Sequence, residues 1–369
     1  MPRYSSSLLN AIDRCVNRVA YQRRYIGEYV NLWRKRGLIK TVCLSPEQKK
    51  QIKKLWKTNY GKSIPLYWHR LYASYTGVVD VNYFPEIFYS TVLERKYNDP
   101  YLALSSENKT QMDLLLRMPT ETRSNVVPML FYKTCGAYFN ASHELITETQ
   151  AEQILASYGR CVIKASMDTD SGRDVKVLEM SDGVDKRSGL TTKEILGFFE
   201  GDFLVQPFLK VHDVLKRINP SSVSTMRIVT YLLKGKAYHA PLALRIGAVG
   251  SDVDNIHAGG MGVGLDDDGF LNEVAFSEFG EKIYTHPGSG VTFKGIQIPG
   301  VKDAIELVEK CHLLIPRLTF VSWDVTIGED GKPVIIEINT RNQAVWLSQM
   351  VNGKSFFGEN TEYMIRQLK

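Results

Sequence analysis

A β-hairpin predicted over residues 321–339 is the feature that most constrains the fold of this chain. Its turn signal is Asp330-Gly331, because a two-residue type I′ turn needs positive φ at both central residues. Counting outward from that turn places Asp324 directly opposite Glu337 on the neighbouring strand. The two carboxylates then face each other with their Cβ atoms about 4.5–5.5 Å apart, where like charges destabilise a sheet.

A bound divalent cation would remove this repulsion. Asn339 lies two residues beyond Glu337 and shares its face, and carboxylate and amide oxygens suit Mg²⁺. Asp324, Glu337 and Asn339 are therefore the candidate metal ligands. The other face of the hairpin is apolar and predicts a core surface made of Trp323, Val325, Ile327, Val334, Ile336 and Ile338. The alternative is an edge hairpin whose acids face water.

The composition predicts a soluble globular protein. The chain has 369 residues, of which 44% are hydrophobic and 23% charged, enough for two or three domains. No apolar run approaches the roughly 18–20 residues that span a bilayer, and the N-terminus lacks the apolar segment of a signal peptide. The five cysteines are odd in number and lack CxxC spacing, which argues for reduced thiols in a cytoplasm and against a disulfide frame or zinc site.

The basic charge is concentrated at the N-terminus. Residues 1–62 carry a net charge of +12, whereas the rest of the chain carries −6. Ser45-Pro46-Glu47-Gln48 predicts a capping box that opens a lysine-rich helix. Two interpretations stay open for it: a solvated surface helix, or a surface that docks onto an anionic membrane face or a polyanionic carbohydrate. Nucleic acid is disfavoured, because no aromatic-studded binding module accompanies the charge.

A long helix is predicted before this one. Ser5-Ser6-Ser7 predicts its start, Arg36 its last residue and Gly37 its stop. Its apolar residues follow a 4-3 spacing interrupted at Gln22: Leu8, Ile12, Cys15, Val19, Ile26, Tyr29 and Trp33. We expect this stripe to pack inside its own chain, with a dimer through the helix as the alternative.

Strands and helices alternate in the second half of the chain, which predicts a mixed α/β fold (α+β). Residues 67–117 have a helical, aromatic pattern, and the following segments add strands at 160–164, 175–180, 203–205, 226–233 and 237–245 and helices at 193–199 and 301–314. The triple aspartate before Gly269 is expected at the tip of a hairpin.

A lysine in this region is a candidate phosphate ligand. Lys164 ends an apolar strand just before a polar loop, where its ammonium group can meet phosphate oxygens as a point charge. The segment does not match a Walker A loop. Many strands also end in a solvated lysine, so this signal alone is weak.

Two further segments could contact a ligand. The strand at 203–205 leaves into a linker whose backbone groups around Val205–Phe208 could bond a purine edge and whose Asp213 could accept from ribose hydroxyls. The segment 245–260 combines Arg245, Asn255 and a glycine pair that lets backbone approach a ligand. The alternative for the strand at 203–205 and its linker is an ordinary strand exit that contacts no ligand.

Taken in order, these segments resemble the ATP-grasp superfamily over about residues 105–345. The chain looks most like the sugar-transfer-associated ATP-grasp proteins. That closer resemblance rests on Ser224-Thr-Met-Arg227-Ile-Val-Thr, on His286-Pro-x-x-Gly290-x-x-Phe293 and on Trp323-Asp324. Their order and spacing together are fairly specific.

The resemblance implies a function for each matching residue. Lys109 and Lys164 would bind phosphates, and Ser171 and Gly172 would belong to a flexible loop over the triphosphate. Val205, Gln206 (where the family more often has Glu) and Phe208 would contact adenine, and Asp213 the ribose. Asp324, Glu337 and Asn339 would hold magnesium. Arg245, with Arg227 and Asn255, would stabilise the transferring phosphoryl group.

The resemblance also implies a fold in which the nucleotide lies between two α/β subdomains, preceded by a basic helical region. We expect a basic N-terminal region at 1–66, an N-terminal domain at 67–145, a lid at 146–208 and a metal-bearing subdomain at 209–369. The location expected is cytoplasmic, with peripheral attachment to the inner face of the membrane as the alternative. The oligomeric state is left open.

The expected activity is that of a carboxylate–amine ligase, which uses ATP with two Mg²⁺ ions, or Mn²⁺ in their place. An acyl phosphate would form, and an amine would convert it to an amide with release of ADP and phosphate. The expected substrates are a uronic acid or similar saccharide carboxylate, for surface-polysaccharide (capsule) biosynthesis, and an amino acid or amine. The alternatives are a phosphotransferase acting on a hydroxyl group and a non-catalytic nucleotide-binding scaffold.

Overall fold

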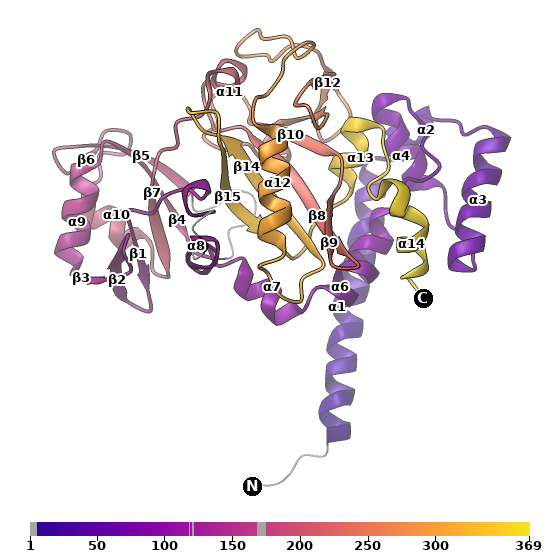
Figure 1. The fold of residues 1–369 in the computed structure, drawn as a ribbon, viewed down its shortest axis with the longest axis horizontal. Helices are drawn as coiled ribbons and strands as arrows, with labels where there is room; N and C mark the ends of the chain where they lie inside the picture. Colours follow the sequence, from indigo (N-terminus) through magenta and orange to yellow (C-terminus); the bar gives the residue numbers. More distant parts are fainter. Residues whose placement is uncertain (1–5, 118, 120–121, 168–174) are drawn as a thin grey trace. The chain divides into compact units, whose positions relative to one another are not determined.

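A computed structural model describes residues 6–117, 119, 122–167 and 175–369, and of residues 6–17 the backbone only. The chain forms two compact units, shown in Figure 1. Unit 1 combines the residues up to Asn98 with Asn342–Lys369, and unit 2 is Asp99–Arg341. The four-part division expected from the sequence stays a prediction. Among the described residues, no helix has the length and apolarity to cross a bilayer.

Unit 1 is helical. Its helices are α1 (Ser6–Arg34), α2 (Arg36–Thr41), α3 (Pro46–Tyr60), α4 (Tyr67–Thr76), α5 (Glu86–Phe88), the π-helical η1 (Tyr89–Leu93), α6 (Glu94–Tyr97), α13 (Trp346–Asn352), η5 (Gly358–Asn360) and α14 (Thr361–Arg366). The predicted capping box is confirmed, since Gln48 N donates to Ser45 Oγ (3.1 Å) and Ser45 N to Gln48 Oε1 (2.8 Å). Gly37 lies inside α2, so it does not end the first helix as predicted.

Three of the four stripe residues of α1 whose side chains are described do not pack inside the chain as expected, whereas Tyr29 packs against Trp68 with 5.7 Å between the ring centres. The side chains of Leu8, Ile12 and Cys15 lie outside the described residues. Val19, Ile26 and Trp33 are 69%, 58% and 63% exposed. The side of α1 that packs within unit 1 instead carries Glu28 and Leu32, which are buried. The face that Val19, Ile26 and Trp33 share therefore points away from the core of unit 1.

The first sheet of unit 2 is antiparallel throughout, in the order β3-β2-β1-β7-β4-β5-β6. Its strands are β1 (Phe131–Thr134), β2 (Ala137–Asn140), β3 (Leu145–Ile146), β4 (Arg160–Ala165), β5 (Val175–Ser181), β6 (Val184–Asp185) and β7 (Phe203–Pro207). Helices α9 (Glu148–Ser157) and α10 (Thr192–Phe198) contribute to its core. The sequence did not identify β1–β3 or α9. Unit 2 also has the short helices α7 (Pro100–Ser106), α8 (Lys109–Arg117), η2 (Arg123–Asn125) and α11 (Asp213–Ile218), and the buried apolar residues of α7, α8 and α11 belong to the core of the second sheet.

The second sheet runs in the order β13-β12-β11-β10-β8-β14-β15, with β9 also paired to β8. Its strands are β8 (Thr225–Leu233), β9 (Lys236–His239), β10 (Leu242–Ile246), β11 (Met261–Leu265), β12 (Leu271–Phe276), β13 (Lys282–Ile283), β14 (Phe320–Ile327) and β15 (Pro333–Asn339). The helical elements are η4 (Ile256–Ala258) and α12 (Val301–His312), the latter buried on one side against the sheet (Figure 1). The strand predicted at 237–245 is two strands, and Gly269 closes the expected hairpin tip by donating to Asp266 O (3.0 Å).

The β14–β15 hairpin differs from the prediction at its turn. Gly328 N donates to Lys332 O (2.8 Å), and Gly331 N donates to Gly328 O (2.9 Å). Gly331 has φ of 80°, whereas Asp330 has no positive φ. The loop therefore has three residues, and Gly328 faces Lys332 in place of the predicted Glu329.

A β-bulge restores the predicted pairing at the acids. Val325 pairs with Ile335, but Asp324 pairs with Glu337, which leaves Ile336 without a partner on β14. The bulge offsets the extra loop residue, so Asp324 and Glu337 lie opposite each other. It also places Ile335 in the core, where the sequence predicted Val334 and Ile336; these two are only half-buried.

Candidate active site

Asp324 is the centre of a cluster of charged side chains on the second sheet. Arg227 of β8 lies directly opposite it across the strand pair, and its Nε and Nη2 donate to Asp324 Oδ1 (2.6 Å) and Oδ2 (3.1 Å). This is a two-bond, charge-assisted contact. Asp324 is only 3% exposed, and its burial raises the pKa of its carboxyl group although Arg245 opposes the shift.

Arg245 connects Asp324 to a second carboxylate, Asp254, whose side chain is 13% exposed. Its Nη1 lies 3.2 Å from Asp324 Oδ2, and its Nη2 lies 2.6 Å from Asp254 Oδ1. The hydroxyl of Thr225, which is paired with Arg245 across β8 and β10, donates to the other oxygen of Asp254. Burial disfavours the charge on Arg245, but Asp254 and Asp324 outweigh it and raise the pKa of the guanidinium above its ordinary value.

Two lysines of the first sheet and α8 adjoin the acids. The backbone N–H of Lys109 donates to Ser166 O (3.0 Å), next to the end of β4, and Lys109 Nζ lies 3.9 Å from Glu337 Oε2. Lys164 is 6% exposed. Burial and the charge of Lys109 lower the pKa of Lys164 to about 8, although Glu337 raises it. Both predicted phosphate-binding lysines therefore lie near the predicted metal ligands.

Glu337 and Asn339 complete the predicted ligand set. The Glu337 side chain is 31% exposed, so it is the accessible carboxylate of the pair. Burial raises its pKa, and Lys109 opposes that shift. Asn339 Nδ2 lies 3.5 Å from Asp324 Oδ2.

The sequence predicted that a bound metal ion is needed to balance the charge of the acid pair. In the structure, cationic side chains of the protein also balance this charge. Four cationic side chains, Arg227, Arg245, Lys109 and Lys164, adjoin Asp324, Glu337 and Asp254. These protein cations offset the repulsion between the carboxylates. Two carboxylates and an amide oxygen still fit a hard divalent cation, so the metal assignment stays a prediction.

The predicted adenine residues lie on and after β7. Val205 is fully buried, and its carbonyl accepts from Leu130 N (2.8 Å). Gln206 is buried, with its Nε2 3.4 Å from Val127 O. Phe208 N donates to Arg160 O (3.1 Å). The predicted ribose ligand Asp213 is the first residue of α11 and is exposed.

The predicted glycine pair holds the loop after β10 in place. Asn255 O accepts from Gly260 N (3.1 Å), and a Cβ at Gly260 would lie 2.7 Å from both Asn255 O and Ile246 O. Only glycine fits such a close approach. The Asn255 side chain accepts from His257 N (2.9 Å). Ser171 and Gly172, predicted for the triphosphate loop, lie outside the described residues.

Two histidines near this region have different environments. His257 is exposed, and its Nδ1 lies 2.9 Å from Glu278 Oε2. His286 is 1% exposed, and its Nδ1 lies 3.2 Å from both the backbone nitrogen and the hydroxyl of Ser289. Burial lowers the pKa of His286, which suits a neutral structural residue.

Asp254 and a second ion pair, Glu107–Arg341, were not predicted from the sequence. Glu107 Oε2 accepts from Arg341 Nε (2.7 Å) and Nη2 (2.6 Å), and Glu107 Oε1 accepts from the backbone N–H groups of Thr340 (3.0 Å) and Arg341 (2.8 Å). These bonds fix the chain just after Asn339. A signal was present, since Arg341 continues the alternation of residues 337 and 339.

Comparisons with known proteins give a family match over most of the chain. The profile of the sugar-transfer associated ATP-grasp family matches residues 89–363. No curated protein matches the sequence.

Similar solved structures include an ADP complex of purK, an N5-carboxyaminoimidazole ribonucleotide synthetase (12% identity, TM-score 0.37, 64% of this chain and 45% of that one). A second is the ATP-grasp ligase PsnB with a minimal precursor (12% identity, TM-score 0.40, 73% of this chain and 64% of that one). A third is D-alanyl-alanine synthetase A from Vibrio cholerae (14% identity, TM-score 0.40, 73% of this chain and 66% of that one). This chain thus spans less than two thirds of the length of each. These likenesses are distant, and the family assignment rests on the profile.

Proposed function

This chain belongs to the sugar-transfer-associated ATP-grasp family, and from that premise we propose that it is an ATP-dependent carboxylate–amine ligase. The observation that carries the proposal is the meeting of Lys109 and Lys164 with the carboxylate pair Asp324–Glu337. Cations beside accessible carboxylate oxygens can hold a triphosphate together with its metal ions.

The charge of the cluster supports a metal-bound nucleotide. Its four basic and three acidic side chains leave a formal charge of only +1. A triphosphate brings about four negative charges, so further cations are needed to balance it. Asp324, Glu337 and Asn339 would hold Mg²⁺, with Mn²⁺ as a substitute, and when bound the metal supplies this positive charge.

The lysines and arginines would position the nucleotide and stabilise charge. Lys109 and Lys164 would contact phosphate oxygens, and Arg245 would face the transferring phosphoryl group. Arg227 holds Asp324 by two hydrogen bonds and so fixes its orientation. In the proposal, the segment Val205–Phe208 contacts adenine, Asp213 the ribose, and Asn255 helps to shape the acceptor side.

The proposed reaction has two steps. An acceptor carboxylate oxygen attacks the γ-phosphorus, the bond to the ADP oxygen breaks, and an acyl phosphate forms. An amine nitrogen then attacks the acyl carbon, inorganic phosphate leaves, and the nitrogen loses a proton to give an amide. Arg245 would stabilise the negative charge that develops on oxygen in both steps. Positioning and electrostatics are the main contributions of the protein.

The proposed acceptor is a uronic acid or a related saccharide carboxylate in surface-polysaccharide biosynthesis, and the proposed donor is an amino acid or another amine. The family's association with sugar transfer supports a saccharide.

The test is ADP release by the full chain with Mg²⁺ and a panel of acid–amine pairs, with the product identified by mass spectrometry. We expect ADP and amide to form in equal amounts with a matching pair. Lys164→Met should abolish turnover, whereas the matched variant Lys193→Met, at an exposed residue of α10, should not. Absence of any pair-dependent turnover would contradict the ligase, and a stable phosphorylated acceptor would identify a phosphotransferase instead.

A further inference from the structure

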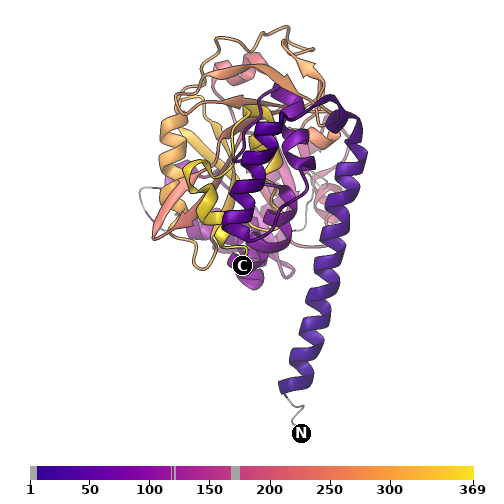
Figure 2. The ribbon, with the colours of Figure 1, turned by 90° about the vertical axis from the view of Figure 1, so that its right-hand side faces the viewer.

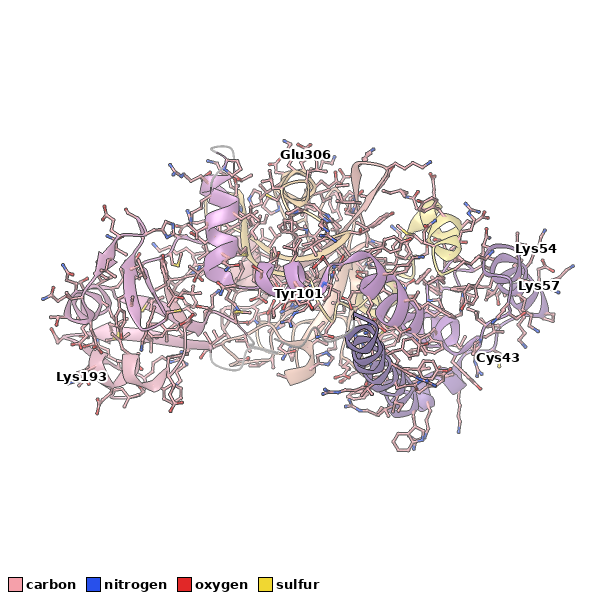
Figure 3. The ribbon with its side chains drawn as sticks, turned by 90° about the horizontal axis from the view of Figure 1, so that it is seen from below. Cys43, Lys54, Lys57, Tyr101, Lys193 and Glu306 are labelled. Carbon is pink, nitrogen blue, oxygen red and sulfur yellow. The ribbon has the colours of Figure 1, made fainter. Side chains whose placement is uncertain are left out.

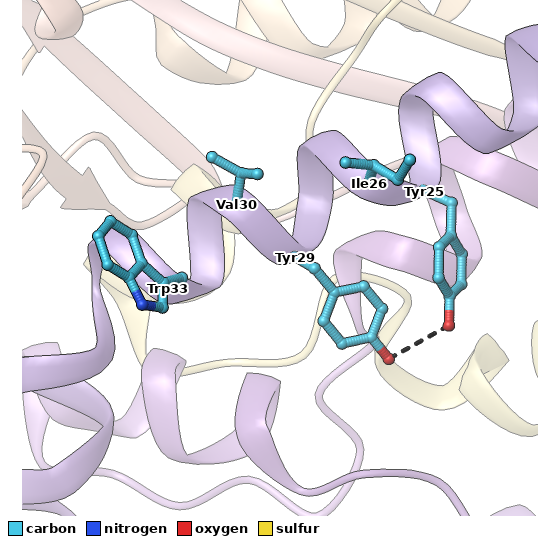
Figure 4. Close-up of a pocket in the computed structure, with 5 residues that line it drawn as sticks. All are labelled: Tyr25, Ile26, Tyr29, Val30 and Trp33. Atoms are coloured by element: carbon cyan, nitrogen blue, oxygen red, sulfur yellow. Dashed lines mark hydrogen bonds between the residues drawn. The ribbon is translucent and has the colours of Figure 1, made fainter.

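The outward face of α1 exposes a row of apolar side chains. Val19, Ile26, Val30 and Trp33 are 69%, 58%, 49% and 63% exposed. Ile26, Val30 and Trp33, together with Tyr25 and Tyr29, line an open hollow of about 380 Å³. Figure 4 shows these five side chains along the helix. Apolar patches of this kind on a helix mark an interaction surface.

This row is not needed for packing within unit 1. The opposite side of α1 supplies the packing contacts, where Glu28 and Leu32 are both 6% exposed; Lys35, directly after the helix, is 9% exposed. Glu28 is paired with Arg24 (3.3 Å) and accepts from Ser90 Oγ (3.3 Å). In Figures 1 and 2 the N-terminal half of α1 extends past the other helices of its unit.

The charges around the row are all positive. Between residues 18 and 40, every exposed charged side chain is cationic: Arg18, Arg23, Arg34, Arg36 and Lys40. The one acid in that range, Glu28, is buried. Helix α3 adds five exposed lysines with Glu47 as its single acid, and Figure 3 labels two of them, Lys54 and Lys57.

At the end of the row, the Trp33 ring is in contact with the guanidinium group of Arg36. The guanidinium carbon of Arg36 lies 4.1 Å from the centre of the Trp33 ring, and Arg36 Nη1 donates to Trp33 O (3.0 Å). An aromatic ring next to a basic group is typical of helices that lie in a membrane interface, where the ring enters the acyl boundary and the cation meets head groups.

We propose that the outward face of α1 docks onto an anionic lipid bilayer. Ile26, Val30 and Trp33 enter the interface, and the arginines beside them contact anionic head groups. This interaction does not depend on the ligase activity. Charge complementarity selects the bilayer, because between residues 18 and 40 every exposed charged side chain is a cation.

A second copy of the chain fits this surface less well. If Val19 and Ile26 occupied core positions of a parallel coiled coil, Arg18 and Arg23 would take the flanking positions that face each other across the dimer. Two arginines would then meet, and neither carboxylate of α1, Asp13 or Glu28, would take a flanking position from which to pair with them. The proposal therefore predicts a chain that does not associate through α1 when lipid is absent.

The test is cosedimentation of the full chain with vesicles of phosphatidylcholine alone and with about 30 mol% phosphatidylglycerol. We expect binding to the anionic vesicles only, weakened by salt. Ile26→Ser/Trp33→Ser should raise the apparent Kd by about tenfold or more, because two apolar side chains no longer enter the interface. The matched variant Leu145→Ser/Val249→Ser, at residues of unit 2 that are 71% and 58% exposed, should bind like the wild type.

The charge is tested separately. Arg23→Glu should weaken binding by about fivefold or more, whereas Lys193→Glu, labelled in Figure 3, should not. The proposal is wrong if anionic vesicles are not bound, or if the control variants lose binding equally. It is also wrong if sedimentation shows a lipid-free dimer that Ile26→Ser dissociates. Equal binding of wild type and Ile26→Ser/Trp33→Ser to soluble polygalacturonate, without vesicle binding, would identify a glycan surface instead.

Discussion

Replacement of Arg245 by Met should destabilise the second sheet strongly. The guanidinium lies 2.6 Å from Asp254 Oδ1 and 3.2 Å from Asp324 Oδ2, and its side chain is only 15% exposed. Removal of one partner from a buried pair costs about 3–5 kcal/mol, because the remaining charge is left without compensation. Asp324 keeps Arg227, so most of the loss should come from Asp254.

That reasoning predicts a partial rescue. Asp254→Asn in the Arg245→Met background removes the uncompensated charge and should restore about 1–3 kcal/mol. Without Arg245, the pKa of the Asp254 carboxyl group rises further above its unfolded value. A carboxyl group whose pKa is raised in the folded state destabilises that state as pH rises toward and through the folded pKa. The free energy of unfolding that Arg245→Met loses should therefore be smaller at about pH 5 than at about pH 8.

The assay is urea unfolding with hydrogen exchange of β8, β10 and β14 read by mass spectrometry, which gives the free energy of the sheet itself. The matched control is Arg160→Met, whose pair with Glu179 spans 3.7 Å between side chains that are 46% and 47% exposed. It should change stability by less than about 1 kcal/mol. If Arg245→Met costs no more than this control, or Asp254→Asn gives no rescue, the account of a buried, mutually compensating cluster is wrong.

Two further predictions concern the same site. Burial lowers the pKa of Lys164 to about 8, and in the proposed site its ammonium group would bind phosphate only when protonated. Calorimetry should therefore show ADP affinity falling as pH rises above that value, and Lys164→Met should remove this dependence; a pH-independent affinity in the wild type would contradict the proposed site. Gly260→Ala should lower stability by about 1–3 kcal/mol in thermal unfolding, since its Cβ would lie 2.7 Å from two carbonyl oxygens. Gly201→Ala, with open space around it, should be neutral, and equal effects of the two would refute the argument.

The sequence predicted the acid pair of the hairpin by counting pairs outward from the Asp330-Gly331 turn. It did not predict the turn, since a three-residue loop with Gly331 at positive φ serves the Asp-Gly pair as well as a type I′ turn does. The bulge beside Asp324 compensates for the difference. The pairing was therefore predicted correctly through two offsetting errors.

Contacts between distant segments could not be predicted in this way. Asp254 reaches Arg245 through a loop whose path depends on Gly260, and Arg227 meets Asp324 only because β8 and β14 are neighbours in the sheet. The sequence shows neither the strand order nor the loop path. The cations that balance the acids were not predicted as their neighbours for the same reason, since they come from other strands and from α8.

The sequence also could not predict that the apolar face of α1 is exposed. A 4-3 spacing shows that apolar residues share a face, but burial depends on which face the other helices cover. Glu28 is buried beside Arg24 and Ser90, so the buried face of α1 carries a charged residue.

The most direct test of the central claim, that the acid pair and its cations form a magnesium–nucleotide site, is calorimetric titration of ADP at increasing Mg²⁺. The suitable variant is Glu337→Gln, because its side chain is 31% exposed and its loss should leave the fold intact. We predict that Mg²⁺ raises ADP affinity by about tenfold or more in the wild type and has little effect in the variant. An affinity that is independent of Mg²⁺ in the wild type, or equally dependent on it in Glu337→Gln, would contradict the account.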